Sequence, residues 1–510
     1  MSKYSGLEAT TELVTQLKAI TGDKELLNTT DKNTLVNAVN ELFDSIFDYT
    51  TTYIFYDSDI VTNTYGFAIL ECNNNILLAY QSRGGMGGGI LYSTDYGATW
   101  QSSNITTGAY TVKKLISGTL LAYNVSSYAQ YVYRSTDNGI TWQQVDNLGY
   151  AQRTITEINT GKLLMTGYAS TTDSAGIGIK YSTDSGATWQ DSNITKGTSY
   201  NIIELNNNIL VATANTSSVQ SDTPAGIFYS TDTGTTWQQS NVTDSQAWYA
   251  YTFGSSNLVA TNKNVGIKYS IDYGVTWQDS NITSTYSTKR EIKVLNNSNT
   301  VQLLASDSSY LLYSTDNGVT WQNSTNMTGT SVSSYNMTEL QDGTLIYSNG
   351  TLKYSTDHGV TWHNSNITEY TWAVTELSNG YIVANCRQTS AGQGLLYSTD
   401  SGVTWQQSNI YNTNDLYTVY LLGNDLLMCN NASVGIKYST DYGVTWQDTS
   451  VTTGQYSTKM ISNGNIIATR TASGGSGKSI KYSTGNDIDP TTLKPKWETA
   501  IEQLAAQLNA

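Results

Sequence analysis

The chain has 510 residues, of which 13% are charged and three are proline, and its formal net charge at pH 7 is −15. So few charges and prolines argue against a disordered chain. The acidic balance argues against nucleic acid as a partner, because phosphate backbones are also anionic. No apolar run reaches the length of a membrane span, and the N-terminus has no apolar signal-peptide core, so we expect no membrane insertion.

The first 50 residues predict helices. A short helix is expected over residues 7–20, and Thr30 is a suitable N-cap for a second one. This second helix has a heptad-like apolar stripe at 4-3-4 spacing, formed by Leu35, Val39, Leu42 and Ile46. A single short helix cannot bury such a stripe, so residues 30–47 predict a homo-oligomer, with a trimer as the expected state. Docking of the helix on the rest of the chain is the alternative.

One part of this segment carries a resemblance. Residues 29–43 (TTDKNTLVNAVNELF) resemble a short segment of bacteriophage fibre and other virion proteins, in which T-x-K-T and an apolar stretch lead into A-[IV]-N-E-L. The resemblance implies a location in the virion and contacts with other virion proteins. The missing signal-peptide core agrees, because phage are released by lysis. The N-x-T triplets at Asn104 and Asn193 are then expected to be unglycosylated strand ends.

A nine-residue motif of the form Y-S-T-D-x-G-x-T-W recurs along the chain with small variations. Its aspartates are Asp95, Asp137, Asp184, Asp232, Asp272, Asp316, Asp357, Asp400 and Asp441. Their mean spacing is about 43 residues, which is the length of a four-stranded propeller blade. The Asp can accept hydrogen bonds from its own turn, the Gly permits a positive φ, and the Trp buries a large ring beside the turn.

The pattern S-x-D-x-G-x-T-W resembles the Asp-box, or BNR, repeat of sialidases, sortilin-type receptor domains and some glycoside hydrolases. The resemblance covers residues 92–447. It implies that each box is the turn between the third and fourth strands of a blade, on the face away from the sialidase active site. A device present nine times suits a fold better than a reaction centre, so we interpret the boxes as structural.

The other strands of a blade can be read from alternating apolar residues and polar turns. In blade four they are predicted at residues 200–205, 209–214, 226–230 and 235–240, with a turn at 206–208. A tenth copy after Tyr456 lacks its fourth strand. Residues 53–63 (YIFYDSDIVTN) resemble a fourth strand such as residues 189–195 (WQDSNIT), so the N-terminal strand is predicted to complete the last blade and close the ring.

The predicted fold is therefore all-β, a single ten-bladed β-propeller of four-stranded Asp-box blades with short amphipathic helices at both termini. The predicted domains are a helical attachment and oligomerisation segment (1–50), the propeller (51–490) and a C-terminal helix (491–510). This last helix repeats the 4-3-4 spacing with Trp497, Ile501, Leu504 and Leu508.

No metal site or cofactor is expected. Cys72, Cys386 and Cys429 are odd in number and lie on or beside predicted strands, so we interpret them as small buried hydrophobes. His358 and His363 flank one turn without further ligands nearby in the sequence.

Catalysis is not expected either. The R-I-P motif of sialidases is absent, and the six arginines Arg83, Arg134, Arg153, Arg290, Arg387 and Arg470 form no evident carboxylate-binding cluster. Five glutamates recur near the end of the inner strand, which indicates turn support or channel lining: Glu71, Glu157, Glu204, Glu339 and Glu376. A sialidase-like or other glycoside hydrolase stays the enzymatic alternative.

A candidate ligand-binding ring lies four residues before the Glu204 position of each inner strand. Its members are Phe67, Tyr110, Arg153, Tyr200, Trp248, Arg290, Tyr335, Trp372, Tyr417 and Tyr456. The position is at the face opposite the Asp boxes, and aromatic rings stack on sugars, so these residues could bind a repeating bacterial surface polysaccharide by avidity. The alternative is that the rings only fill the space between blades.

These observations leave three candidate functions. The first is a phage virion protein, similar to a tail or head fibre, that binds a host-surface glycan. The second is a structural virion decoration protein without a specific ligand, and the third is a glycan hydrolase on the same scaffold.

Overall fold

The computed structural model describes residues 53–60, 66–81, 88–124, 131–147, 153–167, 177–197, 200–214, 225–244, 247–262, 264–283, 292–296, 303–306, 310–328, 337–348, 352–367, 370–387, 394–410, 417–431, 434–471 and 479–483. The chain divides into two compact units, Phe55–Thr484 and a second one made of Met1–Ile54 and Gly485–Ala510. The helices predicted near both termini lie outside the described residues.

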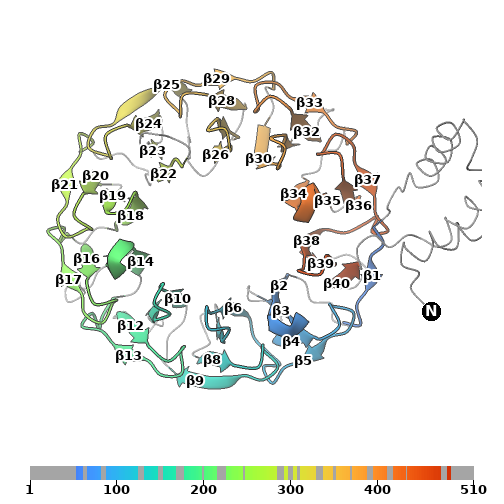
Figure 1. Cartoon of the computed structure of the whole chain (residues 1–510), viewed down its shortest axis with the longest axis horizontal. Coiled ribbons are helices and arrows are strands. Elements are labelled where there is room, and N and C mark those ends of the chain that lie inside the picture. The colour runs from blue at the N-terminus through green and yellow to red at the C-terminus, as the bar shows by residue number, and fades with distance from the viewer. Residues whose placement is uncertain are drawn as a thin grey trace, which may run out of the picture. The chain divides into compact units, whose positions relative to one another are not determined.

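The unit Phe55–Thr484 is a ring of ten four-stranded antiparallel sheets (Figure 1). Each sheet is one blade, with its first strand innermost and its fourth strand outermost. This confirms the predicted ten-bladed all-β fold. Helical structure in the described part is limited to three-residue 3-10 turns, η2 (Asn73–Asn75), η3 (Asn206–Asn208) and η5 (Gly423–Asp425). No helix in the described part is long and apolar enough to cross a membrane.

Blades 1 to 5 consist of these strands: β2 (Phe67–Glu71), β3 (Leu77–Gln81), β4 (Ile90–Ser93) and β5 (Gln101–Ser102); β6 (Tyr110–Lys114), β7 (Leu120–Asn124), β8 (Tyr131–Ser135) and β9 (Gln143–Asn147); β10 (Arg153–Glu157), β11 (Leu163–Gly167), β12 (Ile179–Ser182) and β13 (Gln190–Asp191); β14 (Tyr200–Glu204), β15 (Leu210–Ala214), β16 (Ile227–Ser230) and β17 (Gln238–Gln239); β18 (Tyr249–Phe253), β19 (Asn257–Asn262), β20 (Gly266–Ser270) and β21 (Gln278–Asp279).

Blades 6 to 10 have the same order: β22 (Ile292–Val294), β23 (Leu303–Ser306), β24 (Tyr310–Ser314) and β25 (Gln322–Thr328); β26 (Met337–Glu339), β27 (Leu345–Tyr347), β28 (Lys353–Ser355) and β29 (His363–Asn364); β30 (Tyr370–Glu376), β31 (Ile382–Arg387), β32 (Leu395–Ser398) and β33 (Gln406–Gln407); β34 (Thr418–Leu421), β35 (Leu427–Asn431), β36 (Gly435–Ser439) and β37 (Gln447–Asp448); β38 (Tyr456–Met460), β39 (Ile466–Arg470), β40 (Ile480–Ser483) and β1 (Tyr56–Asp57).

Blade four matches its prediction except at the outer strand. The inner pairing runs from Tyr200↔Ala214 to Glu204↔Leu210. The fourth strand β17 is shorter than predicted, because the predicted residues Thr235 to Trp237 belong to the box turn instead. In blade six, the described inner pairing runs from Ile292↔Ala305 to Val294↔Leu303.

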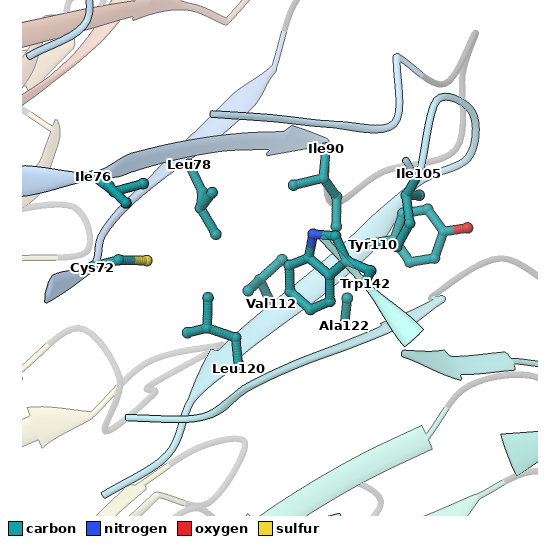
Figure 2. Packing of buried hydrophobic residues seen from close by; sticks show 10 residues of the cluster. All are labelled: Cys72, Ile76, Leu78, Ile90, Ile105, Tyr110, Val112, Leu120, Ala122 and Trp142. Carbon is teal, nitrogen blue, oxygen red and sulfur yellow. The ribbon is translucent and has the colours of Figure 1, made fainter. Parts of the chain in front are cut away.

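The hydrophobic core lies between neighbouring blades. Figure 2 shows one cluster, in which Cys72, Leu78 and Ile90 of blade 1 pack against residues of blade 2 such as Val112 and Trp142. The second strands supply the most deeply buried side chains, because each is covered by strands on both sides and by blades on both faces. Burial of apolar surface therefore stabilises the contacts between neighbouring blades as well as those between the strands of one blade.

The ring is closed by the N-terminal strand. β1 pairs with β40, and Asp57 forms an ion pair with Lys481 as Asp191 does with Lys180 inside blade 3. Phe55 stands where other blades have the box Trp, and its backbone N–H donates to Ser450 Oγ of blade 9 at 2.8 Å. The predicted closure of the last blade is confirmed.

Candidate functional site

Each Asp box is a tight turn with two successive residues of positive φ. In blade 1, Tyr96 has φ 59° and Gly97 has φ 93°, and the N–H of Ala98 donates to the carbonyl oxygen of Asp95 at 3.4 Å. The sequence predicted the Gly but gave no sign that the residue before it is also left-handed. That residue is Asn in only two boxes, Asn138 and Asn317, although Asn tolerates this conformation best after Gly.

The polar groups of the box bind one another. Ser93 Oγ donates to Asp95 Oδ1 at 2.8 Å and accepts from Gly97 N–H at 2.8 Å. The hydroxyl of Thr99 donates to Asp95 Oδ2 at 2.6 Å. Trp100 Nε1 donates to the carbonyl oxygen of Gly97 at 3.0 Å. The Thr–Asp hydroxyl contact recurs at Asp137, Asp184, Asp232, Asp272, Asp316, Asp357, Asp400 and Asp441.

These hydrogen bonds also affect the pKa of the box aspartate. Partial burial acts to raise the pKa of Asp95, but the hydrogen bonds from Thr99 and Ser93 outweigh it and leave that pKa below its ordinary value. The same balance lowers the pKa of Asp184 and Asp400. The carboxylates are therefore held ionised as hydrogen-bond acceptors of the turn, which suits a structural role.

The recurring glutamates join neighbouring blades. Glu204 of blade 4 accepts from the backbone N–H of Asn159 in blade 3, at 2.9 Å for Oε2. Glu71 binds the N–H of Ser462 at 3.0 Å and so joins blade 1 to blade 10. Glu157, Glu339 and Glu376 make the equivalent bond to the preceding blade. Of the two roles predicted for these glutamates, turn support is the one observed.

One pair of carboxyl groups has pKa values shifted in opposite directions. Burial is the main cause that raises the pKa of Glu376, and the nearby Asp342 charge adds to it. The pKa of Asp342 is lowered by hydrogen bonds from Ser401 and Thr344, against the effect of its partial burial. Opposite shifts of this kind are typical of catalytic pairs. Here, however, Glu376 accepts from Gln341 N–H at 3.0 Å in the same way as the other blade-joining glutamates.

Most of the predicted aromatic ring is core. Trp248 is 0% exposed, and its Nε1 donates to Asp244 at 2.8 Å. Tyr110 packs in the cluster of Figure 2. The other described side chains at this position are also buried: Phe67, Tyr200, Tyr417 and Tyr456. A buried ring offers no face to a sugar, so the contacts of these six favour the packing alternative.

The remaining predicted site residues are described in part or not at all. For Arg153 and Trp372 the structure describes the backbones, in β10 and β30, but not the side chains. Arg290 and Tyr335 lie wholly outside the described residues, as do the oligomerisation residues Leu35, Val39, Leu42 and Ile46.

The two faces of the ring differ in their connections. In an antiparallel blade, the first-to-second and third-to-fourth connections lie at one end, and the other connections lie at the opposite end. On the box face, seven residues separate the third and fourth strands in all nine boxes, as between Ser93 and Gln101. On the opposite face, the second-to-third connections range from three residues, after Asn262, to twelve, after Ala214.

The fourth-to-first connections vary as well. They have five residues between β29 and β30 and twelve between β21 and β22. On the box face the first-to-second connections have five residues in eight blades, three in blade 5 and eight in blade 6, so length varies more on the opposite face. Loops of varied length on a rigid scaffold are typical of a recognition surface. Much of this variable face lies outside the described residues.

The cysteine side chains in the described part of the ring belong to the core. No group of three or more His, Cys, Asp or Glu side chains there could hold a metal ion. Cys72 and Cys429 are buried and free, and burial raises the pKa of the Cys72 thiol to about 11. Both thiols are therefore protonated near neutral pH, as expected for small core residues.

A comparison with known protein families identifies the repeat. A family model described as BNR/Asp-box repeat matches residues 133–144, 312–323 and 353–364. No curated protein matches the sequence.

Three solved structures are similar to this chain at low sequence identity. A GH74 enzyme from Niastella koreensis is 18% identical, with 82% of this chain and 75% of that chain covered and a TM-score of 0.30. The GH74 xyloglucanase from Xanthomonas campestris is 13% identical, with 82% of each chain covered and a TM-score of 0.29. YCF48 from Cyanidioschyzon merolae is 13% identical, with 56% of this chain and 95% of that chain covered and a TM-score of 0.30.

These likenesses carry no argument about activity. The matched repeat, the nine box turns and the ten four-stranded sheets agree with one another. The chain is a β-propeller built from BNR/Asp-box repeats.

Proposed function

We propose that the propeller is a binding module that recognises a bacterial surface polysaccharide through the face opposite the Asp boxes, and that it belongs to a phage virion as a tail or head fibre-like protein. The observation that carries this proposal is the contrast between the two faces. On the box face, the connections have seven residues in all nine boxes and five in eight of the ten first-to-second turns, whereas those on the opposite face run from three to twelve residues. Selection for recognition diversifies loops, and selection for folding alone does not require it.

The ligand contacts are assigned to the loops of the variable face. The described aromatic positions beneath them are buried, so they support the face rather than contact a glycan. The long connections between β3 and β4, β11 and β12, and β15 and β16 are the first candidates. Several weak loop sites around one ring would bind a repeating polymer by avidity.

We propose that the protein is not an enzyme. The nine box aspartates and the recurring glutamates are occupied in hydrogen bonds that repeat from blade to blade. Hydrolysis of a glycosidic bond needs a pair of carboxyl groups that face a substrate instead.

Attachment to the virion is assigned to the N-terminal segment. The apolar stripe of Leu35, Val39, Leu42 and Ile46 supports a homotrimer. Light scattering of the full chain should give an oligomer that Leu35→Asp with Leu42→Asp weakens, and a monomeric full chain would remove this part of the proposal.

The test of the proposed function is a glycan array that includes capsular and lipopolysaccharide fragments, read for binding and then for products. Retention of intact glycan supports a binding module. Release of shorter products, lost in a Glu376→Gln or Asp342→Asn variant, would make the protein a hydrolase. No retention of any surface glycan, together with incorporation into particles, would make it a decoration protein.

A further inference from the structure

Two strand positions face each other across every seam between blades. The second-strand residue in the register of Tyr123 points toward the next blade, and the first-strand residue in the register of Ile155 points back toward the previous one. Tyr123 of blade 2 and Ile155 of blade 3 show this arrangement, because both pack in the cluster between those blades. We call these the forward and backward seam positions.

The backward position is apolar in nine blades and polar in one. Aligned by their pairing with the second strands, the nine apolar residues are Ile69, Val112, Ile155, Ile202, Ala250, Ile292, Met337, Val374 and Val419. The exception is Thr458 in blade 10. The forward position is occupied by a polar residue in most blades. A hydrogen bond to the next blade can satisfy such a residue: Thr166 Oγ1 donates to the carbonyl oxygen of Tyr200 at 3.3 Å.

In the seam between blades 9 and 10, the forward and the backward residue are therefore both polar. Its forward residue is Asn430 on β35, 1% exposed, and its backward residue is Thr458 on β38, 5% exposed. These two strands are in contact. Both atoms of the Asn430 amide and the hydroxyl of Thr458 lack a hydrogen-bond partner among the described residues. A buried polar side chain without a partner is costly, and here two of them lie on contacting strands of one seam.

We propose that this seam holds an internal binding site for one or more water molecules, with Asn430 and Thr458 as its polar walls. The amide can donate and accept, and the hydroxyl can do both, so a water between them meets groups of either kind. Both side chains are neutral, and the amide N–H would oppose a cation, so water is the ligand that fits. Asn430 is also a smaller side chain than Tyr123, which packs at the same position in the seam between blades 2 and 3.

The direction in which Thr458→Val changes the melting temperature tests whether water occupies the site. If water bridges the two residues, Thr458→Val in the full chain strands the Asn430 amide and lowers the melting temperature. If the seam is dry, the same isosteric change removes an unsatisfied hydroxyl and raises it. The matched control is Thr213→Val, because Thr213 is a buried forward residue without a partner whose neighbour across the seam is the apolar Ala250.

A crystal structure of the unaltered chain supplies the second readout. We expect ordered solvent density within hydrogen-bond distance of both side chains, a lower melting temperature for Thr458→Val, and an unchanged or higher one for Thr213→Val. Absence of that density would overturn the proposal. So would a melting temperature that rises for Thr458→Val or that falls equally for both variants.

Discussion

Asp59, two residues after the N-terminal strand β1, accepts a hydrogen bond from the backbone N–H of Trp100 in the first blade at 2.8 Å. Asn104 makes the same contact to Trp142 one blade further on, also at 2.8 Å, and its amide donates back to the Trp142 carbonyl. The sequence SDI at residues 58–60 therefore takes the place of SNI in an ordinary fourth strand. The two ends of the ring are joined by the bond that joins other neighbouring blades.

This closure predicts a sharp boundary for N-terminal truncation. Removal of residues 1–50 keeps β1, Phe55 and Asp59, and we expect the propeller to melt near the temperature of the full chain. Removal of residues 1–60 exposes the edge of β40 and deletes the bonds to Ser450 and Trp100, so the melting temperature should fall by several degrees. Calorimetry of both truncations checks this, and equal melting temperatures would show that the ring closes in another way.

The glutamate bonds between blades predict that removing one destabilises the fold and that adding one stabilises it. Glu204→Ala removes the acceptor of Asn159 N–H and should destabilise the fold by roughly 0.5–1.5 kcal/mol. Blade 10 has Met460 at the equivalent position, with its Sδ 3.1 Å from where a Cβ on Gly423 of blade 9 would lie. Met460→Glu would bring a carboxylate to the Gly423 N–H and should stabilise by a similar amount. Urea unfolding measures both, and a destabilising Met460→Glu would contradict the interpretation.

Replacing Thr233 in the box turn of blade 4 with Asn is expected to stabilise the fold. Thr233 is β-branched at φ 59°, a conformation that costs such residues of order 1–3 kcal/mol and that Asn tolerates well. Thr233→Asn gives blade 4 the Asn-Gly turn of blades 2 and 6. The gain should be about 1 kcal/mol or less, because the contact of Lys162 with the Thr233 hydroxyl is lost. Asn138→Thr is the reverse control and should destabilise in thermal denaturation.

The boxes also predict acid sensitivity. Burial acts to raise the pKa of Asp95, Asp137 and Asp232, but hydrogen bonds within the turn lower each below its ordinary value. A carboxyl whose pKa is lower in the folded state stabilises the fold above its unfolded pKa of about 3.9, and this contribution is lost as pH falls through the folded value. Denaturant midpoints should therefore be flat near neutral pH and drop below about pH 4. Asp95→Asn should lessen that drop, and a drop of unchanged size would count against the assignment.

The sequence predicted the fold well because its repeat is short, regular and rich in turn signals. Nine boxes fixed the blade period, and the similarity of residues 53–63 to a fourth strand gave the closure. The hydrogen bonds between blades were harder to foresee. Asn193 looked like a polar strand end, yet its amide binds both the N–H and the carbonyl of Trp237, which is 44 residues away. The available signal was its recurrence one blade before six of the nine boxes, as Asn104, Asn193, Asn241, Asn281, Asn366 and Asn409.

The candidate site was less predictable for a physical reason. The inner-strand aromatics recur at one register position, but a recurring position can be core as easily as surface, and only burial distinguishes the two. Trp248 is 0% exposed, which favours packing at this position. The loops that carry recognition do not repeat, so periodicity gives no information about them.

The most direct test of a recognition face is to shorten loops on opposite faces and compare glycan binding. One variant lacks residues 170–174 and 217–222, from the long connections of blades 3 and 4 on the variable face. The matched control lacks residues 298–300, which reduces the eight-residue turn of blade 6 on the box face to the five residues found in eight other blades. With both variants folded, we expect host-cell or glycan binding to fall at least about tenfold, or 1.4 kcal/mol, for the first and to stay unchanged for the control. Equal binding by both variants, or loss in the control alone, would contradict the proposal that the face opposite the Asp boxes binds the ligand.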